Sequence, residues 1–250
     1  MTIKTDLQDF YNHEAKKYYE TRKKFWQEGD LILQALETLS ASGKKLNILE
    51  IGCGSGRFAS FLQDHYQGKF SYVGVDLSEK LLSYAQKDNP KLTFICEDMS
   101  EFIVRQKQET FDVIIGVASF QHIPSYRERL FLMKHFYRAL RYDGLLIMTN
   151  RSLSQRFLTK HLSEFFCSFG RFLVSFGKSD WRDIYVPWTN KGQTFKRYYH
   201  LFGLKELKKL LDFSGLSLRH LSYIDNKGNC ISQWKDSSNS FLVAQKSPIV

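Results

Sequence analysis

Five short, almost uninterrupted apolar segments alternate with helical patterns between residues 46 and 150. The segments are rich in Val, Ile and Leu, as strands buried on both faces are. They read LNILEI (46–51), FSYVGVD (70–76), LTFICED (92–98), FDVIIGVAS (111–119) and GLLIMTN (144–150). Helical patterns fill the gaps at 57–66, 79–87 and 125–140. This alternation predicts an α/β fold built on a doubly wound parallel sheet.

The last part of the chain adds a helix and two strands. The segment LKELKKLLDFSG (204–215) has a helical pattern and ends at Gly215, a residue type common at helix ends. Two strands are expected near 216–223 and 240–245, joined as an antiparallel hairpin. With the five earlier strands, they predict a seven-stranded, mostly parallel sheet with an antiparallel C-terminal hairpin.

The chain of 250 residues is long enough for one large domain, and no inter-domain linker stands out. We expect a single domain over 1–250, with an N-terminal helical cap (7–40) and an insertion (151–204) that forms a lid and part of a binding site. Within the insertion, residues 162–177 carry apolar side chains at helical spacing. They predict a lid helix that packs its apolar face on the main domain. A helix lying on a membrane surface would need more bases on its polar face.

The charge balance is strongly basic, with 36 Lys and Arg against 26 Asp and Glu, a net charge of +10. Such a surplus suits a polyanionic partner, above all RNA, or an anionic membrane surface, although many lysines also simply keep a surface soluble. Four scattered cysteines form no CxxC pair, which predicts free thiols, a reducing compartment and no zinc site. Without a signal-peptide pattern or an apolar run of roughly 20 residues, we expect a cytoplasmic protein that does not span a membrane.

A glycine-rich loop, GCGSG, follows the first strand and precedes a helix. Gly52, Gly54 and Gly56 allow a tight turn and a close approach of the backbone to a ligand. Backbone N–H groups at the start of the helix can then face a polar or anionic group. A dinucleotide site would have G-x-G-x-x-G, but Arg57 stands where its third glycine would be, which argues against a nicotinamide cofactor.

Acidic residues stand at three neighbouring strand ends. Glu50 precedes the glycine loop, Asp76 ends the second strand before Leu77, and Asp98 ends the third before Met99. A carboxylate at the end of the second strand can accept both ribose hydroxyls, and one at the third can accept an adenine amine. Helix capping would explain either Asp singly, but not the ordered set.

This order of features resembles the class I S-adenosylmethionine-dependent methyltransferases: a strand, a glycine loop, an acidic residue for the ribose and an acidic residue for the adenine. The resemblance implies S-adenosylmethionine as cofactor and an acceptor cavity walled by the segment after the fourth strand, GVASFQHIPS. Ser119 is expected at the cofactor and His122 at the acceptor, as a base or hydrogen-bond donor. The alternative for His122 is a structural donor to a loop carbonyl.

Two further motifs resemble the tRNA wobble-uridine methyltransferases, which convert 5-carboxymethyluridine to its methyl ester. The N-terminal motif residues are Tyr11, Ala15, Tyr18, Thr21, Arg22 and Trp26. The later motif comprises DIYVPW (183–188) and RYYHLF (197–202). The resemblance implies tRNA as a partner, together with a small zinc-binding activator protein, and places Arg22 at the cofactor's carboxylate or at the acceptor.

The chemistry of the later motif fits a carboxylate acceptor. A carboxylic acid is ionised at neutral pH, so methyl transfer to it needs no base. The site only has to bind the carboxylate and orient one oxygen toward the methyl group. We expect Arg197 and His200 to hold the negative charge, with Trp188, Tyr198 and Tyr199 as stacking surfaces for an unstacked base. Alternatively, the aromatic residues are core. Two other functions stay open, a methyltransferase for a small metabolite and a cofactor-binding scaffold without turnover.

Overall fold

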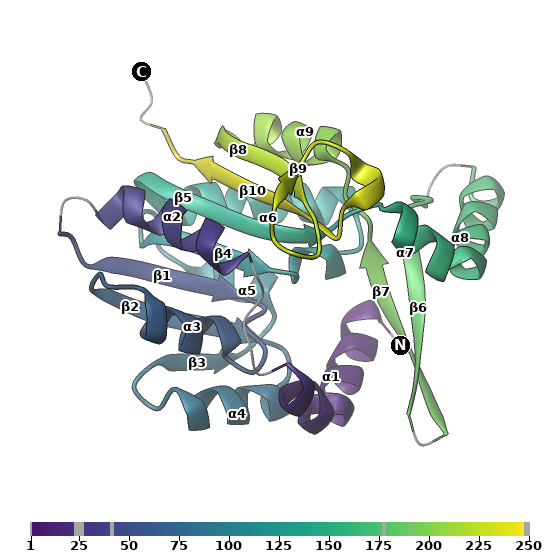
Figure 1. Ribbon diagram of the computed structural model, residues 1–250, viewed down its shortest axis with the longest axis horizontal. Coiled ribbons are helices and arrows are strands. Elements are labelled where there is room, and N and C mark those ends of the chain that lie inside the picture. Colours follow the sequence, from purple (N-terminus) through teal and green to yellow (C-terminus); the bar gives the residue numbers. More distant parts are fainter. Residues whose placement is uncertain (1, 23–27, 41–42, 177–178, 191, 248–250) are drawn as a thin grey trace.

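The computed structural model describes residues 2–22, 28–40, 43–176, 179–190 and 192–247, so Trp26 of the N-terminal motif lies outside it. Within these residues the main sheet has the strand order β3-β2-β1-β4-β5-β10-β8-β9 (Figure 1). Its strands are β1 (Leu46–Ile51), β2 (Phe70–Asp76), β3 (Thr93–Cys96), β4 (Phe111–Val117), β5 (Leu140–Arg151), β8 (Ser217–Ile224), β9 (Cys230–Ile231) and β10 (Asn239–Gln245).

The sheet confirms the predicted fold class. Strands β1 to β5 pair in parallel, whereas β10 lies antiparallel between β5 and β8. The C-terminal hairpin is therefore β8–β10, and the two-residue β9 adds a short eighth strand at the edge. The expected strands at 46–51 and 70–76 coincide with β1 and β2.

Helices cover both faces of this sheet. The helices are α1 (Ile3–Thr21), α2 (Gly29–Ser40), α3 (Arg57–His65), α4 (Glu79–Asp88), α5 (Met99–Arg105), α6 (Tyr126–Ala139), α7 (Gln155–Lys160), α8 (Leu162–Val174) and α9 (Leu204–Ser214). One core joins α2 and α3 to one face, and a second joins α5, α6 and α9 to the other. Successive residues of β1 divide between them, Ile48 facing the first and Leu49 the second, which explains the continuous apolar run.

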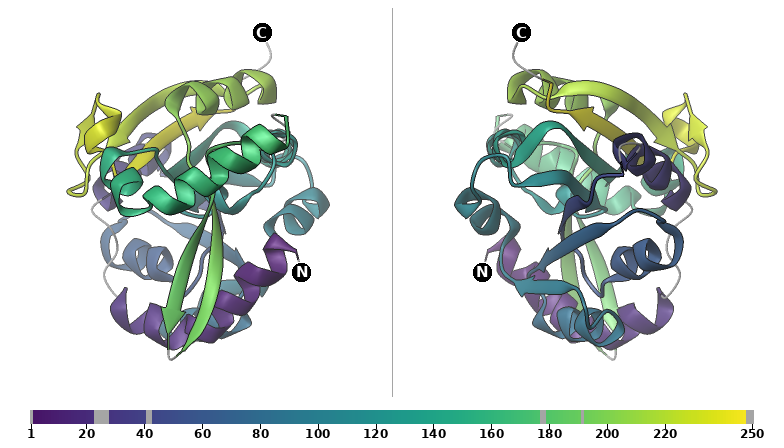
Figure 2. Two further views of the ribbon diagram at one scale, coloured as in Figure 1. Left: turned by 90° about the vertical axis from the view of Figure 1, so that its right-hand side faces the viewer. Right: turned by 90° about the vertical axis from the view of Figure 1, so that its left-hand side faces the viewer.

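The insertion between β5 and α9 contains α7, α8 and a separate antiparallel hairpin of β6 (Asp183–Asn190) and β7 (Gln193–His200). The hairpin projects from the sheet and runs beside α1, as Figures 1 and 2 show. In the described residues, no helix is both long and apolar enough to cross a membrane, and no cluster of His, Cys, Asp and Glu has a metal-binding arrangement.

The prediction that the lid helix packs its apolar face on the main domain is wrong. Helix α8 exposes Leu162, Phe166 and Leu173 by 51%, 63% and 57%, whereas its one buried residue is polar, Ser168. Ser168 donates a hydrogen bond to the carbonyl of Asp183 on β6, so α8 rests on the hairpin by its polar edge. Helical periodicity defines an apolar face, but it does not specify a neighbour to cover that face.

Helix α1 connects the hairpin to the main domain. Its Asn12 side chain accepts a hydrogen bond from Ser78 Oγ, at the start of α4 (2.8 Å). Two residues further on, the buried Glu14 accepts from Trp188 Nε1 (3.0 Å) and from Asn190 Nδ2 (2.8 Å) on β6. The predicted N-terminal cap therefore fixes the late motif against the edge of the sheet where the glycine loop lies.

Candidate functional site

The glycine loop turns back over the ends of β1 and β2. Gly52 and Cys53 donate backbone hydrogen bonds to Val75 O (2.7 and 3.1 Å). At Gly52, φ is +70°, and a Cβ would lie 2.3 Å from Cβ of Ser119. Only glycine fits this close passage of the loop beside the end of β4. The chain thereby opens a space above the carboxyl ends of the parallel strands, the usual ligand position in such sheets.

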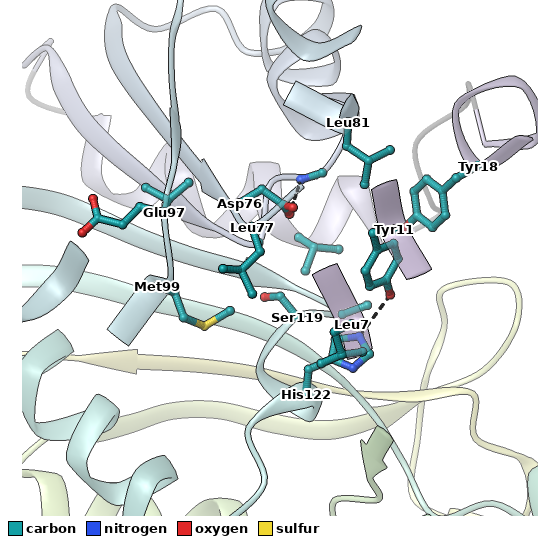
Figure 3. Close-up of a pocket in the computed structure, with 15 residues that line it drawn as sticks. Leu7, Tyr11, Tyr18, Asp76, Leu77, Leu81, Glu97, Met99, Ser119 and His122 are labelled. Carbon is teal, nitrogen blue, oxygen red and sulfur yellow. Dashed lines mark hydrogen bonds between the residues drawn. The ribbon is translucent and has the colours of Figure 1, made fainter. Parts of the chain in front are cut away.

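A cleft of about 640 Å³, its open mouth included, lies at this edge. The predicted residues that line it are Gly52, Gly54, Asp76, Leu77, Met99, Ser119 and His122. Figure 3 shows the side chains of Asp76, Leu77, Met99, Ser119 and His122 around one space, closed on one side by α1. Lining residues that were not assigned to the site from the sequence include Leu7, Tyr11, Tyr18, Leu81 and Glu97. The α1 residues share one face of the helix, a signal that the helical period contains.

Asp76 is held by backbone donors at the centre of the cleft. Its Oδ2 accepts from Gly54 N (2.8 Å) and its Oδ1 from Ser78 N (2.9 Å). Burial raises the pKa of Asp76, although the hydrogen bonds from these backbone amides oppose the rise. The remaining lone pairs of the fixed carboxylate can accept vicinal hydroxyls, as the sequence analysis expected.

Asp98 is not among the residues that line the cleft. Its carboxylate caps α5 by accepting from Ser100 N (2.9 Å) and Glu101 N (3.3 Å), and it pairs with Lys4 (3.0 Å). The structure therefore shows Asp98 as a helix cap, which was the alternative to a ligand-binding role. The side chain that follows it, Met99, does line the cleft, so contact of Asp98 with an adenine stays a prediction.

A second, smaller hollow adjoins the cleft and is lined by Glu50 and Arg57, with Tyr18 shared between the two. Burial raises the pKa of Glu50 to about 8, against the opposing effects of a hydrogen bond from Tyr72 and the charge of Arg57. Arg22 lies over the ring of Tyr18, 4.1 Å from its centroid. A carboxylate next to arginines suits a zwitterionic, amino-acid-like group.

Gly56 lies outside both hollows, at the start of α3 with φ +74°. A Cβ there would lie 2.9 Å from Cβ of Ala85 on α4. Its role in the structure is therefore the close packing of α3 against α4 rather than a contact with a ligand in either hollow.

His122 faces the cleft as a neutral ring. Its Nδ1 lies 2.8 Å from Tyr198 O, which can only accept, so Nδ1 carries the proton. Its Nε2 then accepts from the hydroxyl of Tyr11 (3.2 Å). Burial lowers the pKa of His122 to about 4, and the charge of Arg197 acts in the same direction. His122 is thus a structural donor, although to a carbonyl of strand β7 rather than of a loop, and its role as a base stays a prediction.

Strand alternation divides the residues expected at the acceptor between the two faces of the β6–β7 hairpin. Trp188, Arg197 and Tyr199 share the face that packs on α1, because Val186 pairs with Arg197 and Ile184 with Tyr199 in the hairpin register. Tyr198 and His200 face the opposite way. A period of two makes this separation unavoidable for neighbours in a strand.

On the α1 face, aromatic rings surround the guanidinium of Arg197. Its Cζ lies 4.9 Å from the ring centroid of Phe10, 5.0 Å from that of Trp188 and 5.4 Å from that of Tyr199. The ring of Tyr199 is tilted against His122, with centroids 5.0 Å apart. Arg197 therefore sits in an aromatic frame that reaches the cleft through Tyr199 and His122, and its contact with an acceptor stays a prediction.

On the other face, His200 and Tyr198 belong to a buried charge cluster, which corrects their expected contact with an acceptor. His200 is fully buried, with Nδ1 2.6 Å from Asp183 Oδ1 and Nε2 2.9 Å from Glu206 Oε2. The hydroxyl of Tyr198 lies 2.7 Å from the same Asp183 oxygen and 2.9 Å from Pro124 O. Both side chains hold the root of the hairpin instead.

Comparisons with known proteins match this architecture. Residues 48–144 match the family model described as a methyltransferase domain. The chain is 28% identical over 151 residues to a malonyl-[acyl-carrier protein] O-methyltransferase of Bacillus anthracis, covering 60% of this chain and 54% of that protein. The chain thus spans about half the length of the first curated relatives it matches. It is 23% identical over 256 residues to the tRNA (carboxymethyluridine(34)-5-O)-methyltransferase of Schizosaccharomyces pombe, covering 94% of each chain.

Solved structures share the fold. An S-adenosylmethionine-dependent methyltransferase from Methanosarcina mazei aligns with a TM-score of 0.64 at 19% identity, covering 82% of this chain and 94% of that one. The magnesium protoporphyrin IX methyltransferase of Synechocystis, with bound S-adenosylmethionine, aligns with a TM-score of 0.61 at 16% identity over 99% and 98% of the two chains. The predicted resemblance to S-adenosylmethionine-dependent methyltransferases is confirmed.

Proposed function

We propose that this chain, whose residues 48–144 form a methyltransferase domain, transfers the methyl group of S-adenosylmethionine to a carboxylate oxygen. When bound, the cofactor supplies an electrophilic methyl group on a positively charged sulfur. The residues of the cleft fit it. Asp76 would accept the ribose hydroxyls, Leu77 and Met99 would contact the adenine, and Glu50 with Arg57 would hold the amino-acid end.

A carboxylate acceptor agrees with the state of His122. A neutral imidazole with both nitrogens engaged, Nδ1 by a carbonyl and Nε2 by the hydroxyl of Tyr11, has no free lone pair with which to take a proton. An alcohol or amine acceptor needs a proton removed during methyl transfer, whereas an ionised carboxylate does not. The protein then only has to bind the carboxylate, exclude water and orient one oxygen toward the methyl group.

Arg197 is the observation that carries the proposal. It stands in a frame of three rings beside the cleft, and in the described part of the chain no carboxylate forms an ion pair with it. A guanidinium grips a planar carboxylate with two parallel hydrogen bonds. Both groups of curated relatives are named for acceptors that carry a carboxylate, a malonyl group or a carboxymethyl group.

Of these two acceptors, we favour carboxymethyluridine in tRNA. The match to the S. pombe enzyme extends over 94% of both chains, and the net charge of +10 suits a nucleic acid. The partly exposed ring of Trp188 offers a face for an unstacked base, whereas Tyr199 is buried. The second candidate, a malonyl-type carboxylate on an acyl carrier, is supported by the higher identity of 28% to the Bacillus protein.

The test is methyl transfer from labelled S-adenosylmethionine to tRNA that contains 5-carboxymethyluridine, with nucleosides analysed by mass spectrometry. We expect the methyl ester with the native chain and its loss in Arg197→Ala. The assay is run with the pure chain and again with added cell extract, so that a required activator protein does not hide activity. Label in a malonyl-carrier substrate but not in tRNA would favour the second candidate, and label in neither would refute carboxylate methylation.

A further inference from the structure

Arg151, the last residue of β5, lies at the same edge of the sheet as the cleft. Strand β5 runs parallel to β4, with Val117, the last residue of β4, opposite Thr149, so Arg151 lies two residues beyond the end of the β4 pairing. The backbone N–H of Arg151 donates to Oε1 of Gln121 (2.5 Å), in the turn that also carries His122. Carboxyl ends of parallel strands are where such sheets place their ligand-binding side chains.

We infer that Arg151 and Arg197 together form a two-guanidinium clamp that binds the carboxylate of the methyl acceptor and selects it over a neutral amide of the same shape. This inference rests on the proposed function and adds to it a second residue and a criterion of specificity. Arg151 lies 46 positions before Arg197 in the chain and outside both motifs, so no local pattern connects the two residues.

In the described part of the chain the two guanidiniums have few hydrogen-bond partners, one backbone carbonyl for Arg151 and none for Arg197. The Nε atoms of Arg151 and Arg197 are both shielded from solvent, and neither has a hydrogen-bond acceptor in the described part of the chain. Nor does either form an ion pair with a carboxylate there, in contrast to Arg182, which pairs with Asp180 (2.7 Å) and Glu206 (2.6 Å). Because partly buried charges without a paired carboxylate are costly, two of them beside the same group of rings, that of Phe157 and Tyr199, indicate a site for an external anion.

The charges of the two arginines act on each other. Burial lowers the pKa of Arg151 and the charges of Arg197 and Arg22 lower it further, whereas Tyr199 and the carboxylate of Glu28 oppose the decrease. Burial also lowers the pKa of His161 against the opposing charge of Glu164, and the charges of Lys160, Arg197 and Arg151 add to the decrease. Positive charge from three different parts of the chain therefore converges around Tyr199, and an anion placed there would relieve the repulsion.

Aromatic rings orient both guanidiniums. Arg151 Cζ lies 5.6 Å from the ring centroid of Phe157, and Arg197 Cζ lies 5.4 Å from that of Tyr199. Tyr199 in turn packs on His122, which connects the clamp to the cleft. One N–H of Arg151 is used, Nη1 to Ser238 O (3.1 Å), and its other donors remain for a ligand.

The clamp predicts discrimination between a carboxylate and a carboxamide. A carboxylate accepts from both arginines, whereas an amide presents one acceptor and an NH2 group that would face donors. Charged hydrogen bonds contribute enough that removing one arginine should weaken carboxylate binding by about 10- to 100-fold. Sites built to bond a specific polar group reject analogues that lack it by even larger factors.

The test measures binding rather than turnover. Calorimetry with S-adenosylhomocysteine-loaded protein compares 5-carboxymethyluridine with its neutral amide, 5-carbamoylmethyluridine. We expect the native chain to prefer the acid by at least about 10-fold. Arg151→Ala should lose this preference while keeping its affinity for S-adenosylhomocysteine, Arg151→Lys should keep part of it, and Arg156→Ala, an exposed base on α7, should behave as the native chain.

A second pair of probes, malonate and malonamide, carries the same chemistry without a base. If malonate binds in an Arg151-dependent way but the nucleoside does not, the clamp is supported and the proposed tRNA acceptor is wrong. If the nucleoside acid binds equally well to the native chain and to Arg151→Ala, the proposed function stands and the clamp is refuted. Equal affinity of the native chain for acid and amide refutes the clamp without any variant.

Discussion

The buried charge cluster behind the hairpin makes Glu206→Gln the most informative perturbation of this fold. Glu206 is 8% exposed and accepts from Arg182 Nη1 (2.6 Å) and His200 Nε2 (2.9 Å), with Arg129 Nη2 at 3.4 Å. Arg129 itself is 1% exposed, and Asp183 lies on the far side of the His200 ring. These groups come from α6, α9 and the hairpin, so one carboxylate joins three parts of the chain.

The magnitude follows from the burial of the partners. A glutamine keeps the shape of Glu206 but leaves the positive charge of Arg129 without its carboxylate. Removing one member of a buried ion pair costs about 3–5 kcal/mol. For a chain of this size each kcal/mol lowers the melting temperature by about 2–4 °C, which gives a decrease of about 6–20 °C. Because the hairpin root loosens as well, we also expect weaker acceptor binding at Arg197.

The variant is measured by urea and thermal unfolding beside Asp212→Asn, an exposed carboxylate on the same helix, which should change stability by less than about 0.5 kcal/mol. Burial alone would raise the pKa of Glu206, but the hydrogen bond from His200 and the nearby positive charges outweigh it and hold the pKa below its ordinary value. The contribution of Glu206 to the free energy of unfolding is therefore complete above its pKa in the unfolded chain, near 4.3. It is lost as the pH falls through its lower pKa in the folded protein. A Glu206→Gln protein within about 1 kcal/mol of the native chain at neutral pH would refute the reasoning.

Three further predictions concern the cleft. Gly52→Ala adds a Cβ 2.3 Å from that of Ser119 at φ +70°, so it should lower stability by about 1–3 kcal/mol and abolish cofactor binding in calorimetry; unchanged affinity would exclude the loop as the cofactor site. Since the pKa of His122 is about 4, the pH dependence of the methyl-transfer rate should show no inflection near pH 6.5. An inflection there that disappears in His122→Asn would contradict a His122 that stays neutral. With a pKa of about 8, Glu50 is protonated in the free protein at pH 7, and the ammonium group of S-adenosylmethionine should favour its ionisation. Binding of S-adenosylmethionine should then release protons, so the binding enthalpy measured by calorimetry should depend on the ionisation enthalpy of the buffer. This dependence should disappear in Glu50→Gln. A binding enthalpy of the native chain that is the same in all buffers would contradict this.

The sequence by itself determined the sheet and the position of the cofactor cleft. Runs such as 46–51 and 70–76 are apolar on both faces, a local signal that needs no knowledge of the neighbouring strands. Once the strands are parallel, their carboxyl ends meet at one edge. Gly52, Asp76 and Met99 therefore lie around one cleft although they are far apart in the chain.

Tertiary structure alone decided which residues of the late motif face α1, the side of the hairpin proposed to bind the acceptor. The sequence placed Arg197, Tyr198, Tyr199 and His200 together as candidates, but in a strand neighbours point to opposite sides. The hairpin register turns Arg197 and Tyr199 toward α1, while Tyr198 and His200 meet charges supplied by distant helices. Arg151 joins Arg197 only in space.

The same reason explains the error at α8 and the unassigned cleft residues of α1. Helical spacing shows that Phe166 and Leu173 share a face, and that Leu7 and Tyr11 share another, but spacing is a property of one segment. Whether such a face meets the sheet, a ligand or solvent depends on contacts with residues remote in the chain. Local patterns thus decided the elements and which of their faces are apolar, and long-range packing decided which faces are buried and which neighbours give side chains their chemistry.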